Sequence, residues 1–483
     1  MNKPVIPSVE ETKARMRVVL ERQQKAQLRQ GPPSAALRKD RLTRCITLLL
    51  EHKDELIAAL DADFGARSKD MSAFTDIVAA LAPLKSARSH LDDWMKTRKR
   101  KVTPGALAVL GAKAEVRYQP KGVVGIMTPW NFPVQLSFDA IAGAFAAGNR
   151  VMLKPSELTP QTGAMMADLL DLYFDEDEIA VILGGPDIGA AFSELPFDHL
   201  IFTGGTEIGR RVMAAAARNL TPVTLELGGK CPVVVSRSAD LGKTAARVMM
   251  GKTMNAGQIC LAPDYVITPR ENRDAFVTAT TDAVKKMFPT IKSNPDYTAI
   301  ISQRHYDRVR GLIDDAKAKG AKVVEINPAN EDFSQQEHRK IPPTLILDAT
   351  DDMAVMQEEI FGPVMPVRTY ESFDKAIDEI NARPRPLGLY YFGEDKSESE
   401  ALLNQTHSGG VTINDVIFHI SMDDLPFGGV GPSGMGAYHG ERGFREFSHE
   451  KAVYRQTPSE LISMFRPPYG DAFRKQISSR LKS

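Results

Sequence analysis

Between residues 122 and 227 the sequence alternates between short apolar runs and longer helix-like segments, and this pattern restricts the fold more than any other feature. The apolar runs are 122–128, 150–153, 179–183, 199–202 and 223–227. The helix-like segments between them are 134–147, 160–174, 187–195 and 207–218. Strands that alternate with helices build a parallel sheet that is covered on both faces. The region therefore predicts an α/β fold with a Rossmann-type nucleotide-binding sheet.

The chain extends well beyond this region. A chain of 483 residues is too long for one hydrophobic core, so two or three domains are expected. A second alternating region begins near Cys231 and continues to about Gly410. Upstream of the first region, the helical spacing of apolar residues between Ile46 and Leu60 predicts a helix, with Gly65 as its stop signal.

Charge and hydropathy exclude several classes of partner. Basic and acidic residues number 61 each, so the chain has no global basic field and nucleic acid is not an expected partner. No apolar run approaches the ~20 residues that cross a bilayer, and the N-terminus lacks the apolar core of a signal peptide. The basic stretch 459–483 is interpreted as a solvated tail. We therefore expect a soluble, cytoplasmic protein without a stable membrane anchor.

The cysteines and histidines narrow the chemistry further. The 3 cysteines are an odd, sparse set, which argues against a disulfide framework and suits a reducing compartment. Cys45 falls in the predicted N-terminal helix and Cys231 begins a predicted strand, so both are interpreted as structural. The 9 histidines form no H-E-x-x-H motif and no Cys/His cluster, so no metal site is predicted.

Cys260 is the exception among the cysteines. It ends the segment NAGQIC, and Glu226 stands 34 positions earlier (260 − 226) in the segment LELGGK. An isolated cysteine is more often buried structure. A thiol that attacks a carbonyl, together with a carboxylate that activates a later water, is however the chemistry of covalent catalysis. The pair therefore favours a catalytic interpretation.

Three further segments follow predicted strands, where ligands bind in open parallel sheets. The segment TPWNFP (128–133) contains Asn131, whose amide can donate to an oxyanion; a turn is the plainer interpretation. The segment LKPSE (153–157) carries Lys154 and Glu157, whose side chains can hydrogen-bond hydroxyl groups; the plainer interpretation is a strand that ends before an N-capped helix. The segment FTGGTEIG (202–209) lets backbone approach a pyrophosphate, but it is a weak signal alone.

In this order, together with QEEIFGP (357–363), the motifs resemble those of the aldehyde dehydrogenase superfamily over residues 19–455. The resemblance implies that Cys260 is the nucleophile and that Glu226 is the general base. It also implies that Asn131 and the backbone N–H of Cys260 stabilise the oxyanion. The cofactor-binding residues that it implies are Trp130, Lys154, Ser156, Glu157, Gly205, Gly209, Leu227, Gly228, Glu359 and Phe361.

The same resemblance divides the chain into functional parts. It implies an NAD(P)-binding domain over 1–228, with oligomerisation strands near 101–119. A catalytic domain follows over 229–410, and an oligomerisation segment with a C-terminal tail occupies 411–483. The family often has Ser where this chain has Gly205, so backbone contact to the phosphate must suffice here.

The choice of cofactor depends on two opposed charges. A carboxylate at Glu157 repels a 2′-phosphate and favours NAD, whereas Lys154 attracts that phosphate. We therefore predict NAD as the preferred cofactor, with NADP possible.

The segments that flank the motifs of Glu226 and Cys260 look like those of class 3 aldehyde dehydrogenases. This likeness implies a homodimer that oxidises an aromatic or medium- to long-chain aldehyde, with the conversion of coniferyl aldehyde to ferulate as the specific candidate. A CoA-acylating aldehyde dehydrogenase uses the same thiol but usually lacks the hydrolytic base, so Glu226 counts against it. A non-catalytic binding protein on the same fold is the remaining alternative.

Overall fold

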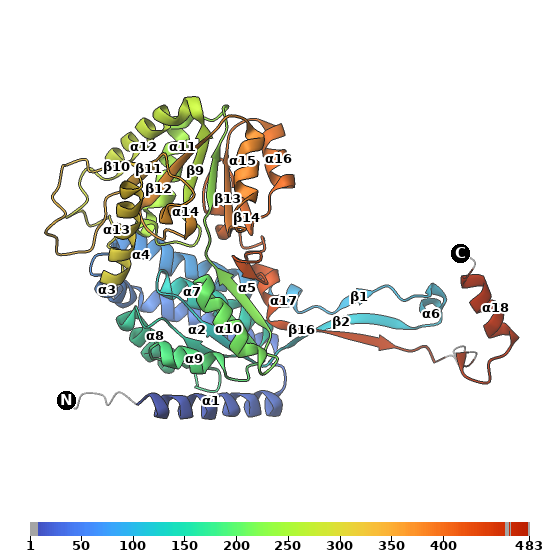
Figure 1. The fold of residues 1–483 in the computed structure, drawn as a ribbon. Helices are drawn as coiled ribbons and strands as arrows, with labels where there is room; N and C mark the ends of the chain where they lie inside the picture. Colours follow the sequence, from blue (N-terminus) through green and yellow to red (C-terminus); the bar gives the residue numbers. More distant parts are fainter. Residues whose placement is uncertain (1–7, 459–462, 464, 482–483) are drawn as a thin grey trace, which may run out of the picture.

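The computed structural model describes residues 8–458, 463 and 465–481. Residues 1–7 of the predicted cofactor domain lie outside the described residues, as do 459–462, 464 and 482–483 of the basic C-terminal stretch. Within the described part, the strands form three sheets. Two of them build a two-lobed body, and the third forms an arm that projects from it (Figure 1).

The first sheet has the strand order β15-β7-β6-β3-β4-β5. The five strands from β7 to β5 are parallel, and β15 pairs antiparallel with β7. The predicted parallel α/β sheet is therefore confirmed, and the buried strands read as continuous apolar runs because helices cover both faces. The bounds are β3 Val123–Met127, β4 Arg150–Lys154, β5 Ile179–Val181, β6 His199–Gly204, β7 Val223–Leu227 and β15 Gly434–Met435.

Helices pack around this sheet. The crossover helices are α7 Pro133–Ala147, α8 Pro160–Tyr173, α9 Pro186–Ser193 and α10 Thr206–Ala217. The N-terminal segment supplies α1 Val9–Gln30, α2 Ala35–Glu51, α3 Lys53–Phe64, α4 Lys69–Ser72, the π-helix η1 Ala73–Val78 and α5 Ala79–Trp94. The helix predicted around Ile46–Leu60 is in fact two helices, because the chain breaks at His52. Gly65 ends the second one in the left-handed conformation, as predicted.

The second sheet has the order β10-β11-β12-β9-β8-β13-β14, parallel except where β10 joins β11. Its strands are β8 Pro232–Val235, β9 Tyr265–Pro269, β10 Lys322–Glu325, β11 Thr344–Leu347, β12 Val364–Tyr370, β13 Gly388–Phe392 and β14 Gly410–Ile413. The helices of this lobe are α11 Leu241–Thr253, α12 Arg273–Met287, α13 Gln303–Ala318, α14 Ala354–Gln357, α15 Phe373–Asn381 and α16 Lys396–Gln405. Residue 228 lies in the connection between the two large sheets. The domain boundaries stay a prediction.

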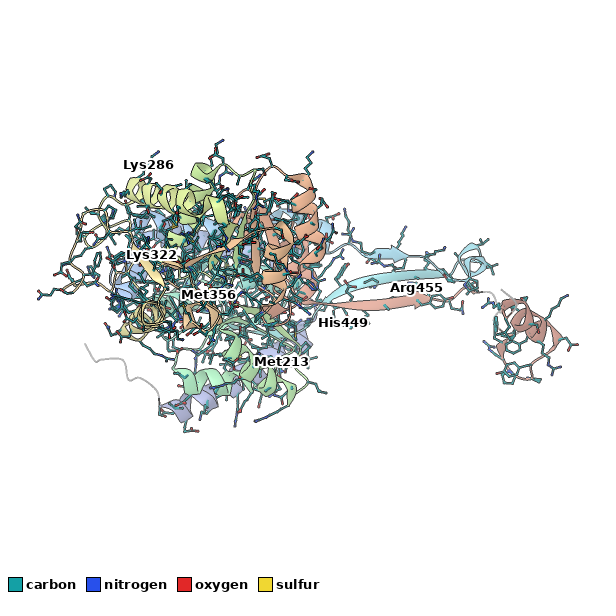
Figure 2. The ribbon with its side chains drawn as sticks, turned by 45° about the horizontal axis from the view of Figure 1, so that its top comes forward. Met213, Lys286, Lys322, Met356, His449 and Arg455 are labelled. Carbon is teal, nitrogen blue, oxygen red and sulfur yellow. The ribbon has the colours of Figure 1, made fainter. Side chains whose placement is uncertain are left out.

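The third sheet forms the arm. It joins β1 Arg98–Arg100, β2 Lys113–Pro120 and β16 Ser448–Arg455 in antiparallel order β1-β2-β16. Figure 2 shows His449 and Arg455 along this extension. The short helix α6 Gly105–Val109 lies at its far end, α17 Gly440–Glu446 at its base, and α18 Asp471–Arg480 beyond its tip (Figure 1). None of the helices that the structure describes combines the length and apolarity needed to cross a bilayer.

Candidate active site

The carboxyl ends of β3 and β6 lie next to each other, although the chain visits β4 and β5 between them. The strand order therefore reverses at β3, and crevices at such a switch point bind ligands in open α/β sheets. The loop after β3 carries Trp130 and Asn131, and the turn after β6 carries Gly205. The order of the strands thus brings two of the predicted motifs together.

The second sheet presents the opposite strand ends to the same crevice. Cys260 precedes β9, Glu359 and Phe361 precede β12, and the segment 228–230 precedes β8. Since these strands are parallel, their amino ends meet at one edge. Between the two edges lies a cavity of about 770 Å³. The predicted site residues that line it are Cys260, Glu226, Asn131, Trp130, Gly205, Leu227, Gly228, Glu359 and Phe361.

The loop before Cys260 has an unusual backbone. Asn255 and Ala256 adopt φ values of 48° and 53°, in the left-handed region that non-glycine residues rarely occupy. Gly257 follows with φ 75°, and a Cβ there would collide with the carbonyl oxygen of Gly362. Such strain persists only where the surrounding structure holds it, and it gathers at active sites. The backbone therefore turns sharply just before the thiol.

The surroundings of the Cys260 thiol disfavour its ionisation. Burial, reinforced by the carboxyl groups of Glu359 and Glu226, raises its pKa to about 12. The backbone N–H groups of Cys260 and Leu261 oppose this shift, because they favour the thiolate. A thiolate is the reactive form, so the thiol must lose its proton before it attacks a carbonyl.

Glu226 is a buried carboxyl without a hydrogen-bond partner among the described residues, at either oxygen. Burial, with the nearby charges of Asp139 and Glu446, raises its pKa well above the usual value. A carboxyl with a raised pKa is a stronger base than an exposed one, as a general base near neutral pH requires.

Asn131 points its amide toward the thiol loop. Its Nδ2 donates a hydrogen bond to the carbonyl oxygen of Gln258, 3.1 Å away, and its Oδ1 has no partner in the described part of the chain. An amide nitrogen carries two hydrogens, so one donor is left for a ligand. Asn131 is therefore a buried donor, and its amide is held by Gln258, which lies two residues before Cys260.

The cofactor residues of the second lobe meet those of the first at Gly228. A Cβ on Gly228 would collide with the carboxylate of Glu359, so only glycine lets the two approach. Burial, with the charge of Asp264, raises the pKa of Glu359 to about 8. Its Oε1 is buried without a partner among the described residues, which suits a carboxylate that accepts from a bound hydroxyl group. The cavity therefore fits the ribose of a dinucleotide.

The glycine-rich turn after β6 has Gly205 where the family often has Ser, and there is room for a side chain at this position. A Cβ on Gly205 would meet nothing within 4 Å, so backbone and open space stand where a serine hydroxyl can occur. Gly205 is the N-cap of α10 and supplies no side-chain cap, which leaves N–H groups there to bind an anion. Gly209 does not line the cavity; it packs against Leu227, whose Cδ2 would lie 2.6 Å from an added Cβ.

The ribose segment after β4 lies outside the cavity lining. Lys154 is buried, and its Nζ donates to the carbonyl oxygen of Pro155 at 3.1 Å and reaches Glu157 Oε2 at 3.4 Å. Burial lowers the pKa of Lys154. Ser156 Oγ accepts from the backbone of Leu158. Lys154 and Glu157 are thus paired with each other at the carboxyl end of β4, outside the cavity lining.

Several residues were missed from the sequence. Tyr438, Phe427 and His305 line the cavity, and Trp130 stands edge-on to Phe361 and His305, with ring centroids 5.4 and 5.1 Å apart. Tyr438 and Phe427 lie more than 160 residues after Cys260 and belong to none of the motifs used to predict the site. Only the fold brings them to the thiol.

Two more buried groups border the site. His439 Nε2 lies 2.8 Å from Asp139 Oδ2, and its ring stacks on Phe427 with centroids 5.0 Å apart. Lys252 is fully buried, its Nζ has no hydrogen-bond partner among the described residues, and burial lowers its pKa to about 8. Neither group belongs to a local sequence motif.

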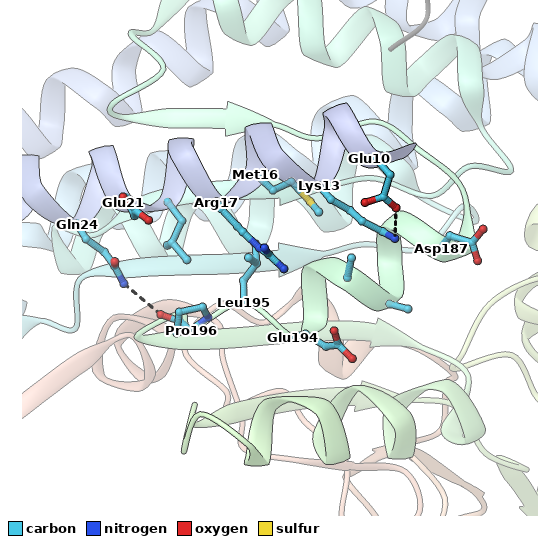
Figure 3. Close-up of a pocket in the computed structure, with 13 residues that line it drawn as sticks. Glu10, Lys13, Met16, Arg17, Glu21, Gln24, Asp187, Glu194, Leu195 and Pro196 are labelled. Atoms are coloured by element: carbon cyan, nitrogen blue, oxygen red, sulfur yellow. Dashed lines mark hydrogen bonds and ion pairs between the residues drawn. The ribbon is translucent and has the colours of Figure 1, made fainter. Parts of the chain in front are cut away.

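A second hollow lies elsewhere, between α1 and α9 (Figure 3). It mixes basic and acidic side chains, with Lys13 bound to Glu10 and Gln24 donating to the carbonyl of Pro196. It contains none of the predicted site residues. The cavity at Cys260 is therefore the candidate active site.

A family model described as "Aldehyde dehydrogenase family" matches residues 3–453. The chain belongs to the aldehyde dehydrogenase family. As a member, it is an oxidoreductase that oxidises aldehydes with NAD or NADP. The resemblance that the motifs implied is confirmed, as is the fold.

Individual aldehyde dehydrogenases are similar over almost the full length. The chain is 59% identical to the "Probable coniferyl aldehyde dehydrogenase" of Caulobacter vibrioides, covering 100% of both chains. It is 52% identical to the "Coniferyl aldehyde dehydrogenase" of a Pseudomonas species, covering 96% of each. Among solved structures, the substrate-bound state of AldH from Staphylococcus aureus superimposes with a TM-score of 0.90 at 35% identity, over 99% of this chain and 100% of the other.

Proposed function

We propose that this aldehyde dehydrogenase oxidises an aromatic aldehyde of the coniferyl type to its carboxylic acid, with ferulate as the product from coniferyl aldehyde. The names of the two bacterial relatives support this substrate. The observation that carries the proposal is that Cys260 and the partnerless carboxyl of Glu226 line one cavity. The rings of Trp130, Phe427 and Tyr438 in the same lining suit a flat aromatic substrate.

In the first half of the reaction, Cys260 acts as the nucleophile. The thiol first gives its proton to solvent, and the thiolate sulfur then bonds to the aldehyde carbon, while the electron pair of the C=O π bond moves to the oxygen, which becomes an oxyanion. The amide of Asn131 and the backbone N–H of Cys260 donate to that oxygen, because donors that are fixed in place stabilise developing charge without reorganising. The chemistry that bound NAD supplies is that of a hydride acceptor, which leaves a thioester on Cys260.

In the second half, Glu226 takes a proton from water, and the water oxygen attacks the thioester carbon. The carbon–sulfur bond then breaks, which releases the acid, and the leaving sulfur takes up the proton that Glu226 accepted, which restores the thiol. The buried, partnerless carboxyl supports this role, since no protein donor competes for its oxygens among the described residues.

The remaining roles concern the cofactor. Glu359 binds the nicotinamide ribose, with Trp130, Phe361, Leu227 and Gly228 around the nicotinamide, while Gly205 exposes backbone to the pyrophosphate. Gly209 lets α10 approach β7 behind that turn.

Beyond the β4 strand, Lys154, Ser156 and Glu157 hold the adenosine ribose. We propose NAD as the preferred cofactor, because Glu157 is the more exposed member of its pair with Lys154.

The enzyme is further proposed to be a cytoplasmic homodimer with the three-part organisation predicted above. The arm supports an oligomeric state, because its outer strands β1 and β16 leave one edge each without a strand partner in the described part of the chain.

An absorbance assay of NADH formation with coniferyl aldehyde, benzaldehyde and hexanal tests the substrate, run with and without CoA. Coniferyl aldehyde should give the highest kcat/KM, and ferulate should form without CoA. NADH formation that requires CoA and gives an acyl-CoA product would favour the CoA-acylating alternative. Absence of NADH with all three aldehydes would contradict the proposed function.

A further inference from the structure

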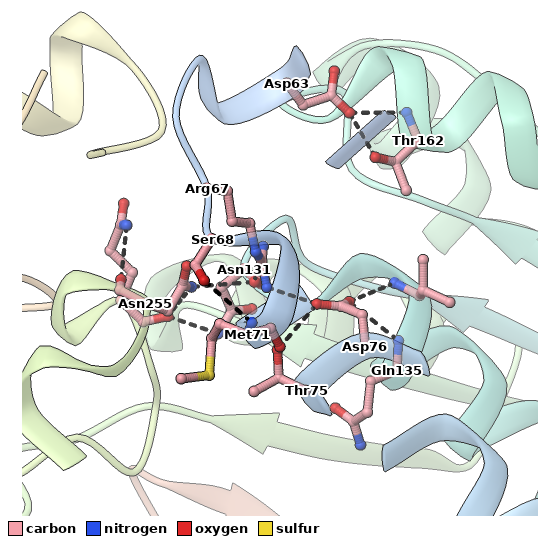
Figure 4. A network of polar contacts seen from close by, with 12 residues as sticks. Asp63, Arg67, Ser68, Met71, Thr75, Asp76, Asn131, Gln135, Thr162 and Asn255 are labelled. Atoms are coloured by element: carbon pink, nitrogen blue, oxygen red, sulfur yellow. Dashed lines mark hydrogen bonds and ion pairs between the residues drawn. The ribbon is translucent and has the colours of Figure 1, made fainter. Parts of the chain in front are cut away.

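Arg67 and Asp76 form an ion pair that is completely buried beside the Asn131 loop (Figure 4). Arg67 Nη2 lies 2.6 Å from Asp76 Oδ2, and both side chains are inaccessible to solvent. The guanidinium also lies between two rings, 4.5 Å from the centroid of Phe64 and 5.3 Å from that of Phe132. Burying two charges is unfavourable unless their hydrogen bonds are well satisfied. Such a pair therefore calls for an explanation beyond stability.

One end of the pair contacts Asn131 directly. Arg67 Nη1 donates to the backbone carbonyl oxygen of Asn131 at 2.8 Å. Asn255, from the thiol loop, donates to the same oxygen at 3.2 Å, and its amide also reaches the carbonyl of Gln258. The residue proposed as oxyanion donor is thus fixed at its backbone by one side chain from the N-terminal segment and one from the Cys260 loop.

The other end of the pair holds the helix that follows. Asp76 Oδ1 accepts from the backbone N–H of Val134 at 3.2 Å and of Gln135 at 3.5 Å, in the first turn of α7. Phe132, the N-cap of α7, provides no side-chain cap, so Asp76 does so from another element. A carboxylate at a helix N-terminus also interacts favourably with the helix dipole.

Asp76 reaches this position from the π-helix η1. Single π-helical turns inside longer helices often occur at functional sites, because they shift side chains out of the regular α-helical register. Thr75 Oγ1 lies 3.4 Å from Asp76 Oδ2 and donates at 2.8 Å to the carbonyl of Met71, so the turn itself is hydrogen-bonded.

We infer that Arg67 and Asp76 are positioning residues that orient the Asn131 amide toward the oxyanion, by fixing the Asn131 carbonyl and the start of α7 at once. The inference rests on the proposed function, in which Asn131 donates to the oxyanion. Neither residue touches the substrate: both act through Asn131. Loss of the pair should slow the step that forms and oxidises the thiohemiacetal, and leave cofactor binding unchanged.

The test is a double-mutant cycle on single-turnover NADH formation, with enzyme in excess over coniferyl aldehyde and NAD saturating. Asp76→Asn keeps the size of the side chain and removes the charge. Alone it should slow NADH formation about 10-fold, and Asn131→Ala should slow it by ~10²-fold or more. Added to Asn131→Ala, Asp76→Asn should have almost no further effect, because the donor that it positions is gone. The KM for NAD should stay at the wild-type value.

A matched control comes from Asp63, which lies in the same view (Figure 4). Asp63 accepts from the backbone of Gln161 and Thr162 at 2.9 and 2.8 Å, so it caps α8 as Asp76 caps α7. Asp63→Asn should lower the melting temperature but leave single-turnover NADH formation unchanged. Arg67→Lys is the second variant for the cycle; it keeps the positive charge but cannot bridge both partners with a planar fork.

The outcomes separate the two proposals. Equal slowing by Asp76→Asn in the wild-type and Asn131→Ala backgrounds would overturn the positioning role, as would a lower melting temperature without any change in rate. A single-turnover rate of Asn131→Ala equal to that of the unmodified enzyme would also overturn it, since no donor would then need to be positioned. Failure of the unmodified enzyme to form NADH would instead contradict the proposed function itself.

Discussion

At the scale of single residues, the site brings one thiol and two carboxyl groups together, and burial raises the pKa of all three. Burial and two neighbouring carboxyl groups raise the pKa of Cys260 to about 12. The pKa of Glu359 rises to about 8. Burial is the largest cause for each group, and the two carboxyl groups add to the pKa shift of the thiol, because a negative charge nearby disfavours the thiolate. The protonation of this cluster is what alkylation and pre-steady-state kinetics report.

Alkylation of the cofactor-free enzyme by iodoacetamide should label Cys260 first, because Cys45 and Cys231 are fully buried. Below a pKa of about 12, the thiolate fraction rises tenfold per pH unit. The labelling rate should therefore rise about tenfold per unit between pH 7 and 9, without a plateau. Mass spectrometry of peptides locates the label, and Cys260→Ala should abolish both labelling and aldehyde oxidation. A plateau near pH 8 would contradict the raised pKa.

Glu226→Gln keeps the size of the side chain but removes its basicity. Hydride transfer should survive, so stopped-flow absorbance should record a burst of NADH close to one per active site. The steady rate that follows should fall by ~10²–10⁴-fold, the usual contribution of a general base. A steady rate equal to that of the wild type would mean that another group activates the water.

We predict that the pair Lys154–Glu157, 3.4 Å apart, decides the cofactor preference. Wild-type kcat/KM should be higher with NAD than with NADP. Glu157→Gln should improve NADP use selectively, because it removes a like charge, although a half-exposed contact is often worth only ~1 kcal/mol or less. Lys154→Ala should weaken both cofactors, NADP more. An unchanged NADP/NAD ratio in Glu157→Gln would show that Glu157 does not read the ribose.

At the scale of elements, close packing of α10 on β7 holds the glycine-rich turn in place. Gly209→Ala would place a methyl group 2.6 Å from Leu227 Cδ2, and overpacking of this kind costs ~1–3 kcal/mol. Its control is Gly311→Ala on α13, where a Cβ meets nothing within 4 Å. That change should stabilise the protein by ~0.5–1 kcal/mol, since alanine favours helix more than glycine does. Thermal melts of both variants should therefore move in opposite directions, and a lowered melting temperature for Gly311→Ala would be inconsistent with this packing.

Much of the element order was predictable, because both large sheets are parallel except at one edge strand each, and their buried strands read as apolar runs. The break at His52 was not, since the apolar spacing continues from Leu49 to Leu56 on one buried side. The motifs that line the candidate active site could also be found in the sequence, as each is local. Arg67 and Asp76 were not, because each acts on a partner more than fifty residues away and belongs to no motif.

At the scale of the whole molecule, a buried polar chain ties the first sheet to α17. Lys121 Nζ donates to His199 Nδ1 at 2.9 Å, His199 Nε2 lies 2.8 Å from Thr224 Oγ1, and Thr224 donates to Glu446 at 2.8 Å. With Nδ1 as acceptor, the imidazole is neutral. A second proton would face the ammonium of Lys121 in a buried space, so the folded state resists protonation of His199.

Burial, followed by the charge of Lys121, lowers the pKa of His199 from 6.5 to about 3. The unfolded chain binds this proton below pH 6.5 and the folded chain does not until about pH 3. The contribution of this site to the free energy of unfolding should therefore be fully present above pH 6.5. It should fall by ~1.4 kcal/mol per pH unit as the pH drops toward 3. Melting temperatures between pH 7.5 and 4.5 measure the slope.

The control is His449→Gln on the exposed face of the arm, which should keep the wild-type pH dependence. His199→Gln should be less stable at pH 7.5 but lose less stability on acidification. The same slope in His199→Gln as in wild type would assign the acid sensitivity to other groups.

The strands of the arm are synthesised at different times. Its central strand β2 ends at Pro120, but the strand that pairs with it begins at Ser448, 328 residues later (448 − 120). At ~5–20 residues per second of synthesis, one side of β2 waits roughly 20–60 s for its partner to leave the ribosome. Lys113, Glu115 and Arg117 alternate along the waiting strand, and charged side chains deter unwanted strand pairing. The arm thus closes only after the strands of both large sheets have been synthesised.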